Sequence, residues 1–298
     1  MRILIALLMG ILSTSGWSMG KPLVVCLEQE SAPYSTESGG VDNDVALAVA
    51  DGLGLPLIIH WYETEGGDEG NPALQVNALL SAGKCELAGG FALAKNSFAH
   101  PREQSYPLET GPGERRSVSL KPLAPSLPYH SQVFTLIWAS TPADPAPESL
   151  DDLGEITLLA QENSVADLIL MAHRGGQLRD SIRHVKEGGG SLLTALADGE
   201  ADAGWLAQHH FEQWKRQHPR NNLQPSGLIH DFTINLGFAA LKSNAQLLER
   251  VDEQLDQLVA DGDIAAIFER HQLTYVEPES SRLMPPLSTR LLGDKKVP

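Results

Sequence analysis

The segment from Gly40 to Gly54 constrains the fold of this chain more than any other part of the sequence. It lies between two short apolar runs, residues 23–27 and 55–59, and each run is typical of a buried strand. A strand, a loop, a helix and a second strand in this order make a βαβ unit, which begins a parallel sheet. The sequence therefore predicts an α/β protein.

The same segment predicts the limits of its helix. Asp42 or Asn43 is placed to cap the helix start, because a side-chain oxygen there can accept a free backbone N–H. The residues that follow give the helix a broad apolar side. Gly54 supplies the left-handed conformation that commonly ends a helix.

The first twenty residues are typical of a secretory signal peptide. Arg2 precedes an apolar run over residues 3–12, and small and polar residues follow over 13–20. The run is short for a membrane span, and no Cys follows it that would accept a lipid. We expect residues 1–20 to be removed and the mature chain to be free in the periplasm.

Composition and motifs argue against several classes of function. The formal net charge of −16 argues against nucleic acid and anionic membranes as partners. The sequence contains no metal-ligand spacing, phosphate loop, nucleophile motif or dinucleotide motif, so we expect no cofactor and no enzyme activity. On this view His209 and His210 belong to a solvated helix or loop, and residues 188–190 form a turn before a helix.

The chain has two cysteines, and both fall beside predicted strands. Cys26 ends the first strand, and Cys85 begins a third predicted strand that continues over residues 86–90. These two strands are neighbours in a doubly wound sheet, and the periplasm is an oxidising compartment. We expect a disulfide between them, with two separate buried thiols as the alternative.

Several segments resemble, in order, motifs of the family 3 (amino-acid type) extracellular solute-binding proteins. Together they extend over residues 23–276. The matching residues are Gly40, Asp42, Asp44, Val45, Val49, Ala50 and Leu53 in the helix, Pro128 and Tyr129 before an apolar strand, Ser149, Asp152 and Leu153 in an S-x-x-D-L turn, and residues 192–203 with their Gly turn and Asp202-Ala203.

This resemblance implies a type II periplasmic binding protein fold, with two α/β lobes built on doubly wound sheets and joined by two hinge strands. Lobe one is expected over residues 21–130 and 230–277, and lobe two over residues 131–229. Residues 92–127 are rich in Pro and are expected to be a surface insertion. Residues 278–298 are expected to be a flexible tail without a core of its own.

The resemblance also implies candidate ligand-binding residues in lobe one. Tyr34 occupies the place of an aromatic ligand platform, and Gly90, Phe91 and Ala92 end the third strand. The family usually carries a T-P-E-R motif next, whose Arg clamps a carboxylate. Here that motif is matched only loosely, around Arg115, which we prefer to Arg116 as the clamp. Two solvated surface arginines are the alternative.

In lobe two the resemblance indicates Asn163 and Ser164, which lie at a predicted helix start. Free backbone N–H groups there favour a carboxylate. Gln208 stands where the family often has an acid that pairs with a ligand ammonium. This difference weakens the case for a plain α-amino acid.

The function implied is that of the periplasmic solute-binding component of an ABC uptake system. Such a protein is a non-enzymatic monomer that binds an amino acid or a related carboxylate and delivers it to an inner-membrane ABC permease. A second hypothesis starts from Cys26 and Cys85, which resemble those of binding-protein relatives associated with quinoprotein alcohol dehydrogenases. That resemblance implies an accessory protein. A third hypothesis is an exported dehydratase on the same scaffold.

Overall fold

The computed structural model describes residues 21–64, 72–99, 104–111, 113–139, 147–186, 188–278 and 283–284. The expected signal peptide lies outside these ranges. Within them, no helix is long and apolar enough to cross a membrane.

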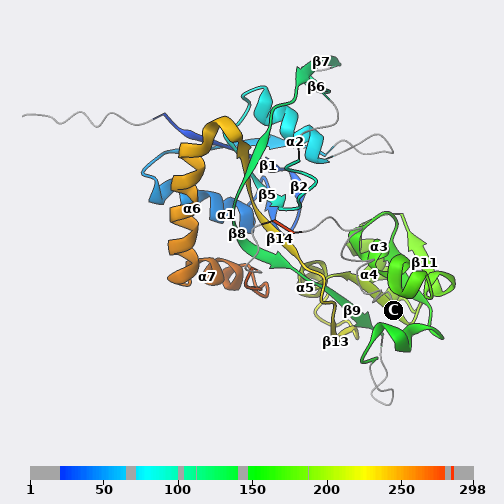
Figure 1. Ribbon diagram of the computed structural model, residues 1–298. Helices are drawn as coiled ribbons and strands as arrows, with labels where there is room; N and C mark the ends of the chain where they lie inside the picture. Colours follow the sequence, from blue (N-terminus) through cyan, green and yellow to red (C-terminus); the bar gives the residue numbers. More distant parts are fainter. Residues whose placement is uncertain are drawn as a thin grey trace, which may run out of the picture.

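The protein has two lobes, and each is built on a five-stranded sheet (Figure 1). The sheet of lobe one contains β1 (Leu23–Glu28), β4 (Leu57–Tyr62), β5 (Leu87–Ala92), β8 (Leu123–Gln132) and β14 (Ile234–Leu241), and two hairpins add β2 (Glu30–Ser31), β3 (Ser35–Thr36), β6 (Ser105–Gly111) and β7 (Glu114–Ser119). Its helices are α1 (Val41–Gly52), α2 (Pro72–Ser81), α6 (Ala245–Ala260) and α7 (Asp263–Arg270). Lobe two contains β9 (Phe134–Trp138), β10 (Leu158–Gln161), β11 (Ile182–Val185), β12 (Ala203–Ala207), β13 (Gln224–Ile229), α3 (Val165–Ala172), α4 (Gly189–Ala197) and α5 (Gln208–Gln217).

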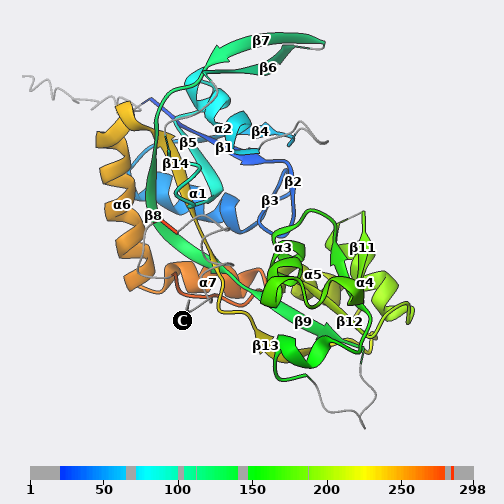
Figure 2. The ribbon, with the colours of Figure 1, turned by 45° about the vertical axis from the view of Figure 1, so that its right-hand side comes forward.

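The strand order shows how the chain divides between the lobes. The first sheet has the order β4-β1-β5-β14-β8, and the second has the order β11-β10-β12-β9-β13. Strand β1 pairs in parallel with β4 and β5, whereas β14 is antiparallel to both β5 and β8. The chain therefore passes to lobe two between β8 and β9 and returns between β13 and β14, as Figure 2 shows.

Helix α1 packs on the core of lobe one through part of its apolar side, and Leu47 of the same helix is 48% exposed. Val41, Val45 and Val49 are all fully buried and recur every four residues, which places them on one side of the helix. The expected cap is wrong: Gly40 precedes the helix, and no side chain caps it. Asp42 is buried against Tyr129 instead.

The expected surface insertion, residues 92–127, contains a β-hairpin, and its last residues belong to β8 of the main sheet. In this hairpin, β6 and β7 pair antiparallel, and β6 turns Tyr106 and Leu108 into a small core with α2. Strand β7 is almost entirely exposed. Both views show the hairpin projecting from lobe one on the side away from lobe two (Figure 2).

Cys26 and Cys85 form a disulfide, as expected from the sequence. Their Cα atoms are 5.6 Å apart, and both residues are buried. The bond ties β1 to the turn that precedes β5. It therefore links two strands that lie side by side in the first sheet.

The expected tail is wrong at one point. Met284 is only 2% exposed and packs on lobe one. Its N–H donates to the carbonyl of Leu93 at 2.9 Å, and its own carbonyl accepts from the N–H of Lys95 at 2.9 Å. An apolar residue in a segment otherwise rich in Pro, Ser and charge thus gives the chain an anchor point here.

Candidate ligand-binding site

A cavity of about 420 Å³ lies between the two lobes. Lobe one contributes Glu30 and Ala32, which follow β1 in the chain. Lobe two contributes Gln161, the last residue of β10. The remaining lining residues are Gly188, Gly189, Gly190, Ser191, His210, Gln213, Trp214 and Gln217. The cavity therefore stands at the edge where the strands end, as expected for ligand sites in open α/β sheets.

A second cavity of about 140 Å³ adjoins the first on the side of lobe two. The two cavities share Gln161, Gly189 and His210. The other lining residues are Gln132, Phe134, Ser164, Val165, Ala166, Leu192, Trp205, Leu206 and Ala207. We call the 420 Å³ cavity the outer cavity and the 140 Å³ cavity the inner cavity.

Three helices of lobe two begin beside these cavities. Ser164 caps α3, since its hydroxyl oxygen accepts the N–H of Asp167 at 3.0 Å. Gly189 begins α4, and a Cβ added there would lie 3.0 Å from Nδ1 of His210. Glycine at this position therefore lets the imidazole of α5 approach the start of α4 closely.

The side chains that line the two cavities carry little charge. Burial lowers the pKa of His210 to about 4, so its imidazole is neutral at pH 7. Glu30 is the one Asp, Glu, Lys or Arg residue in the two linings, and it is exposed to solvent. Amide, hydroxyl and neutral imidazole groups would therefore contact a solute in the outer cavity.

Tyr34 lies in a buried cluster at the hinge. Its hydroxyl is 3.1 Å from Nε2 of His130 and 3.2 Å from Nδ1 of His209. Tyr34 and His209 are each only 6% exposed. Burial, reinforced by the nearby carboxylates of Asp42 and Glu212, raises the pKa of Tyr34 well above its usual value. In this arrangement the ring packs on protein side chains.

The two histidines of this cluster are held neutral. Burial lowers the pKa of His130 to about 3, and burial also lowers the pKa of His209 well below its usual value. The expectation that His209 lies in a solvated helix or loop is wrong. The reason is tertiary: α5 turns this side chain toward Tyr34 of the other lobe.

Gly90 belongs to a second buried network. Its N–H donates to the hydroxyl oxygen of Tyr129 at 2.9 Å, and that hydroxyl donates to Asp42 at 2.6 Å. Burial raises the pKa of Asp42 to about 6, although the hydrogen bond from Tyr129 opposes this shift. Phe91 packs edge-on against Phe98, with ring centroids 5.5 Å apart, and Ala92 is exposed.

Arg115 does not reach this region. It lies on the exposed strand β7, opposite Glu109 of β6, and Arg116 lies beside it. The prediction that Arg115 projects into the cleft near Phe91 is therefore wrong. The motif around it forms part of a hairpin on the far side of lobe one (Figure 2).

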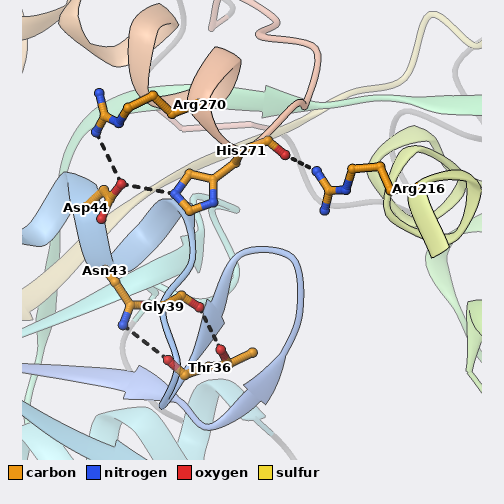
Figure 3. A network of polar contacts seen from close by, with 7 residues as sticks. All are labelled: Thr36, Gly39, Asn43, Asp44, Arg216, Arg270 and His271. Carbon is orange, nitrogen blue, oxygen red and sulfur yellow. Dashed lines mark hydrogen bonds and ion pairs between the residues drawn. The ribbon is translucent and has the colours of Figure 1, made fainter.

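Direct contacts between the lobes surround helix α5. The carboxylate of Glu212 accepts the N–H of Thr274 at 3.0 Å and also its hydroxyl. Arg216 donates to the carbonyl of His271, whose Nε2 lies 3.0 Å from the carboxylate of Asp44 in α1 (Figure 3). Polar contacts thus run from α5 of lobe two to α1 of lobe one.

The expected binding residues fall into separate places. Ser164 lines the inner cavity, and Tyr34 and Gln208 line a small cavity of about 10 Å³ at the hinge. Asn163 is exposed next to Ser164. None of Gly90, Phe91, Ala92 and Arg115 is among the residues that line these three cavities.

Sequence reasoning did not single out His210, Trp205 or Gln213 as candidate site residues. One signal was present in the sequence. A helix starts shortly after β10, another directly after β12, and a third, α4, after the segment that precedes it. The carboxyl ends of these segments therefore converge on one edge of the second sheet. Applying that rule to all three helix starts of lobe two, and not only to the one at Ser164, would have selected residues 188–191 and 209–214.

Solved structures show the same fold at low sequence identity. The unliganded, open L-cystine solute receptor of Neisseria gonorrhoeae is 18% identical over 87% of this chain and 95% of its own, with a TM-score of 0.60. The open substrate-binding domain 2 of Lactococcus lactis GlnP is 17% identical over 85% and 98%, with a TM-score of 0.59. A histidine kinase sensor domain similar to periplasmic binding proteins is 17% identical over 87% and 99%, with a TM-score of 0.58.

No family model matches the chain, and no curated protein matches its sequence. The structural likeness covers most of the chain and of each solved structure. It supports the fold that the sequence motifs imply. The protein has the two-lobed α/β fold of the periplasmic binding proteins.

Proposed function

We propose that the protein binds a small polar solute in the outer cavity between its lobes, without enzymatic chemistry. The observation that carries this proposal is that residues of both lobes line one cavity at the strand ends. A ligand that contacts both lobes binds one relative orientation of the lobes better than others, which is how such a fold converts binding into a hinge motion.

We further propose that the protein works in the periplasm as a monomer and delivers its ligand to an inner-membrane ABC permease. The signal-like residues 1–20 and the disulfide Cys26–Cys85 support export to an oxidising compartment. An amino acid or related carboxylate is the proposed ligand class, since structural neighbours include an L-cystine receptor and an arginine-binding protein.

Ligand binding can be tested on protein purified from the periplasm of its native cell. Native mass spectrometry will show a small molecule bound to the folded chain, and calorimetry with that molecule will give its affinity. Gln213→Ala removes an amide that lines the cavity and should weaken binding about tenfold. Gln257→Ala, on an exposed turn of α6, is the matched control.

An accessory role beside a periplasmic quinoprotein dehydrogenase is the second candidate. The outward position of Arg115 favours it, since an arginine clamp for a carboxylate is then missing from the cavity lining. Copurification of such a dehydrogenase with the exported protein, together with an empty cavity by native mass spectrometry, would support this role over uptake.

A further inference from the structure

The inner cavity differs from the outer cavity in the character of its walls. Most of its lining side chains are apolar, among them Phe134, Leu192, Trp205 and Leu206. Its volume of about 140 Å³ is close to that of an engineered apolar cavity of about 150 Å³ that binds benzene. A six-membered carbon ring, or a branched aliphatic group of similar size, therefore fits this space.

Polar groups gather where the two cavities adjoin. Gln161 and His210 line both cavities. Among the described residues, no hydrogen bond joins the imidazole of His210 to another side chain or to the backbone. The outer cavity adds Ser191, Gln213 and Gln217 to this polar set. A polar group of a ligand would find neutral donors and acceptors here, next to an apolar space.

Trp205 adds a second observation about the inner cavity. It is 0% exposed, it lines the inner cavity, and its indole N–H is buried without a hydrogen-bond partner. A buried donor without an acceptor costs free energy. No polar group of the described residues pairs with this donor, so the surroundings of Trp205 suit the apolar part of a ligand better than its polar head.

From these observations we propose that the ligand is amphiphilic and carries a ring-sized apolar group. The apolar group enters the inner cavity beside Trp205, and the polar head stays in the outer cavity, where it contacts His210 and Gln161. This inference rests on the proposed solute-binding function and specifies the chemical class of the solute. The opposite orientation would bury the polar head among apolar walls and leave the apolar group in contact with water.

Two pairs of probes test this proposal on the exported, disulfide-bonded protein. L-Phenylalanine and L-alanine share a zwitterionic head, and benzamide and acetamide share a neutral one. Within each pair, the compound with the ring should bind at least about tenfold more tightly in calorimetry, because the ring is removed from water. Equal affinities within both pairs would overturn the proposal.

A variant pair on helix α3 locates the ring. Val165→Phe fills the inner cavity and should reduce the affinity for the compound with the ring about tenfold. The affinity for the compound of the same pair that lacks the ring should stay unchanged. Leu168→Phe is the control, because Leu168 is 45% exposed on the same helix. If Val165→Phe does not fold, Ala207→Val tests a second lining position of the same cavity.

The outcomes separate this proposal from the proposed function. Binding of polar solutes with no gain from a ring, or with no effect of Val165→Phe, would leave solute binding intact and refute the ring-sized group. In another outcome none of the four probes binds, while native mass spectrometry finds a small polar solute without an apolar group. This result would refute the present proposal alone. Failure of all four probes with no solute found would refute both.

Discussion

The hydroxyl of Tyr34 in lobe one lies 3.2 Å from Nδ1 of His209 in lobe two. Both side chains are buried, and the same hydroxyl is 3.1 Å from His130 at the hinge. One hydroxyl therefore lies within hydrogen-bond distance of two neutral imidazoles, one on β8 and one on α5. In this arrangement the lobes are held together by the protein's own side chains.

We predict that Tyr34→Phe lowers the free energy of unfolding by about 1–3 kcal/mol, because it leaves buried imidazole nitrogens without their partner. Urea unfolding at pH 7 measures the change. Tyr275→Phe is the matched control, since the hydroxyl of Tyr275 is buried without a hydrogen-bond partner. The control should cost little. Equal losses in the two variants would contradict the role given to the Tyr34 hydroxyl.

The neutral histidines predict a loss of stability in acid. The folded-state pKa of His130 is about 3, and that of His209 is also lowered, whereas an unfolded histidine titrates near 6.5. The unfolded chain therefore takes up these protons first. Their contribution is fully present above pH 6.5 and falls by about 1.4 kcal/mol for each histidine and pH unit below it.

Asp42 has the opposite effect on the stability of the fold in acid. Its folded-state pKa is raised from 3.8 to about 6, so the folded protein takes up this proton before the unfolded chain does. Between about pH 6 and 4 this gain offsets the loss from one histidine. We predict that Asp42→Asn makes the fall of stability over this range steeper than in the wild type. If the wild type and Asp42→Asn lose stability equally steeply over this pH range in urea unfolding, this compensation by Asp42 is ruled out.

Glycine substitutions separate backbone strain from steric overlap. Gly90 and Gly54 have φ values of +64° and +68°. A Cβ at Gly90 would lie 2.4 Å from the carboxylate of Asp42, whereas none of the neighbouring atoms lies within 4 Å of a Cβ at Gly54. We predict that Gly54→Ala costs about 1–2 kcal/mol and that Gly90→Ala costs clearly more. Thermal unfolding of both variants measures the difference.

The disulfide should contribute strongly to stability. It closes a sequence separation of 59 residues, which corresponds to about 4 kcal/mol in the chain-entropy model. We predict that the Cys26→Ala, Cys85→Ala double variant unfolds at a correspondingly lower urea concentration. Alkylation of the denatured, unreduced wild type should detect no free thiol. Two alkylated thiols would show that the bond does not form in the exported protein.

The fold was predictable because its main signals are local. Short apolar runs mark β1, β4 and β5, and the parallel order that follows from βαβ connections places Cys26 beside Cys85. The helix after β1 was predictable from its apolar spacing. Its cap was not, because Asp42 turns inward to Tyr129, which is 87 residues away in the sequence.

The candidate site was harder to predict because its contacts are tertiary. His209 is 175 residues from Tyr34 in the sequence, so no local pattern shows that it is buried. Arg115 stands in a motif that resembles a ligand clamp, yet backbone pairing within residues 105–119 places it on an exposed hairpin. Ser164 was indicated by the family resemblance, and the helix start that it caps is a local feature of the sequence.

Helix α5 presents two different sides to the rest of the molecule. His209, Glu212 and Arg216 contact lobe one, and His210, Gln213 and Gln217 line the outer cavity. A helix is stiff over this length, so a shift of one side carries the other with it. A solute bound in the outer cavity would touch the same helix whose other side contacts lobe one, so we expect solute binding and the contacts between the lobes to influence each other through this one element.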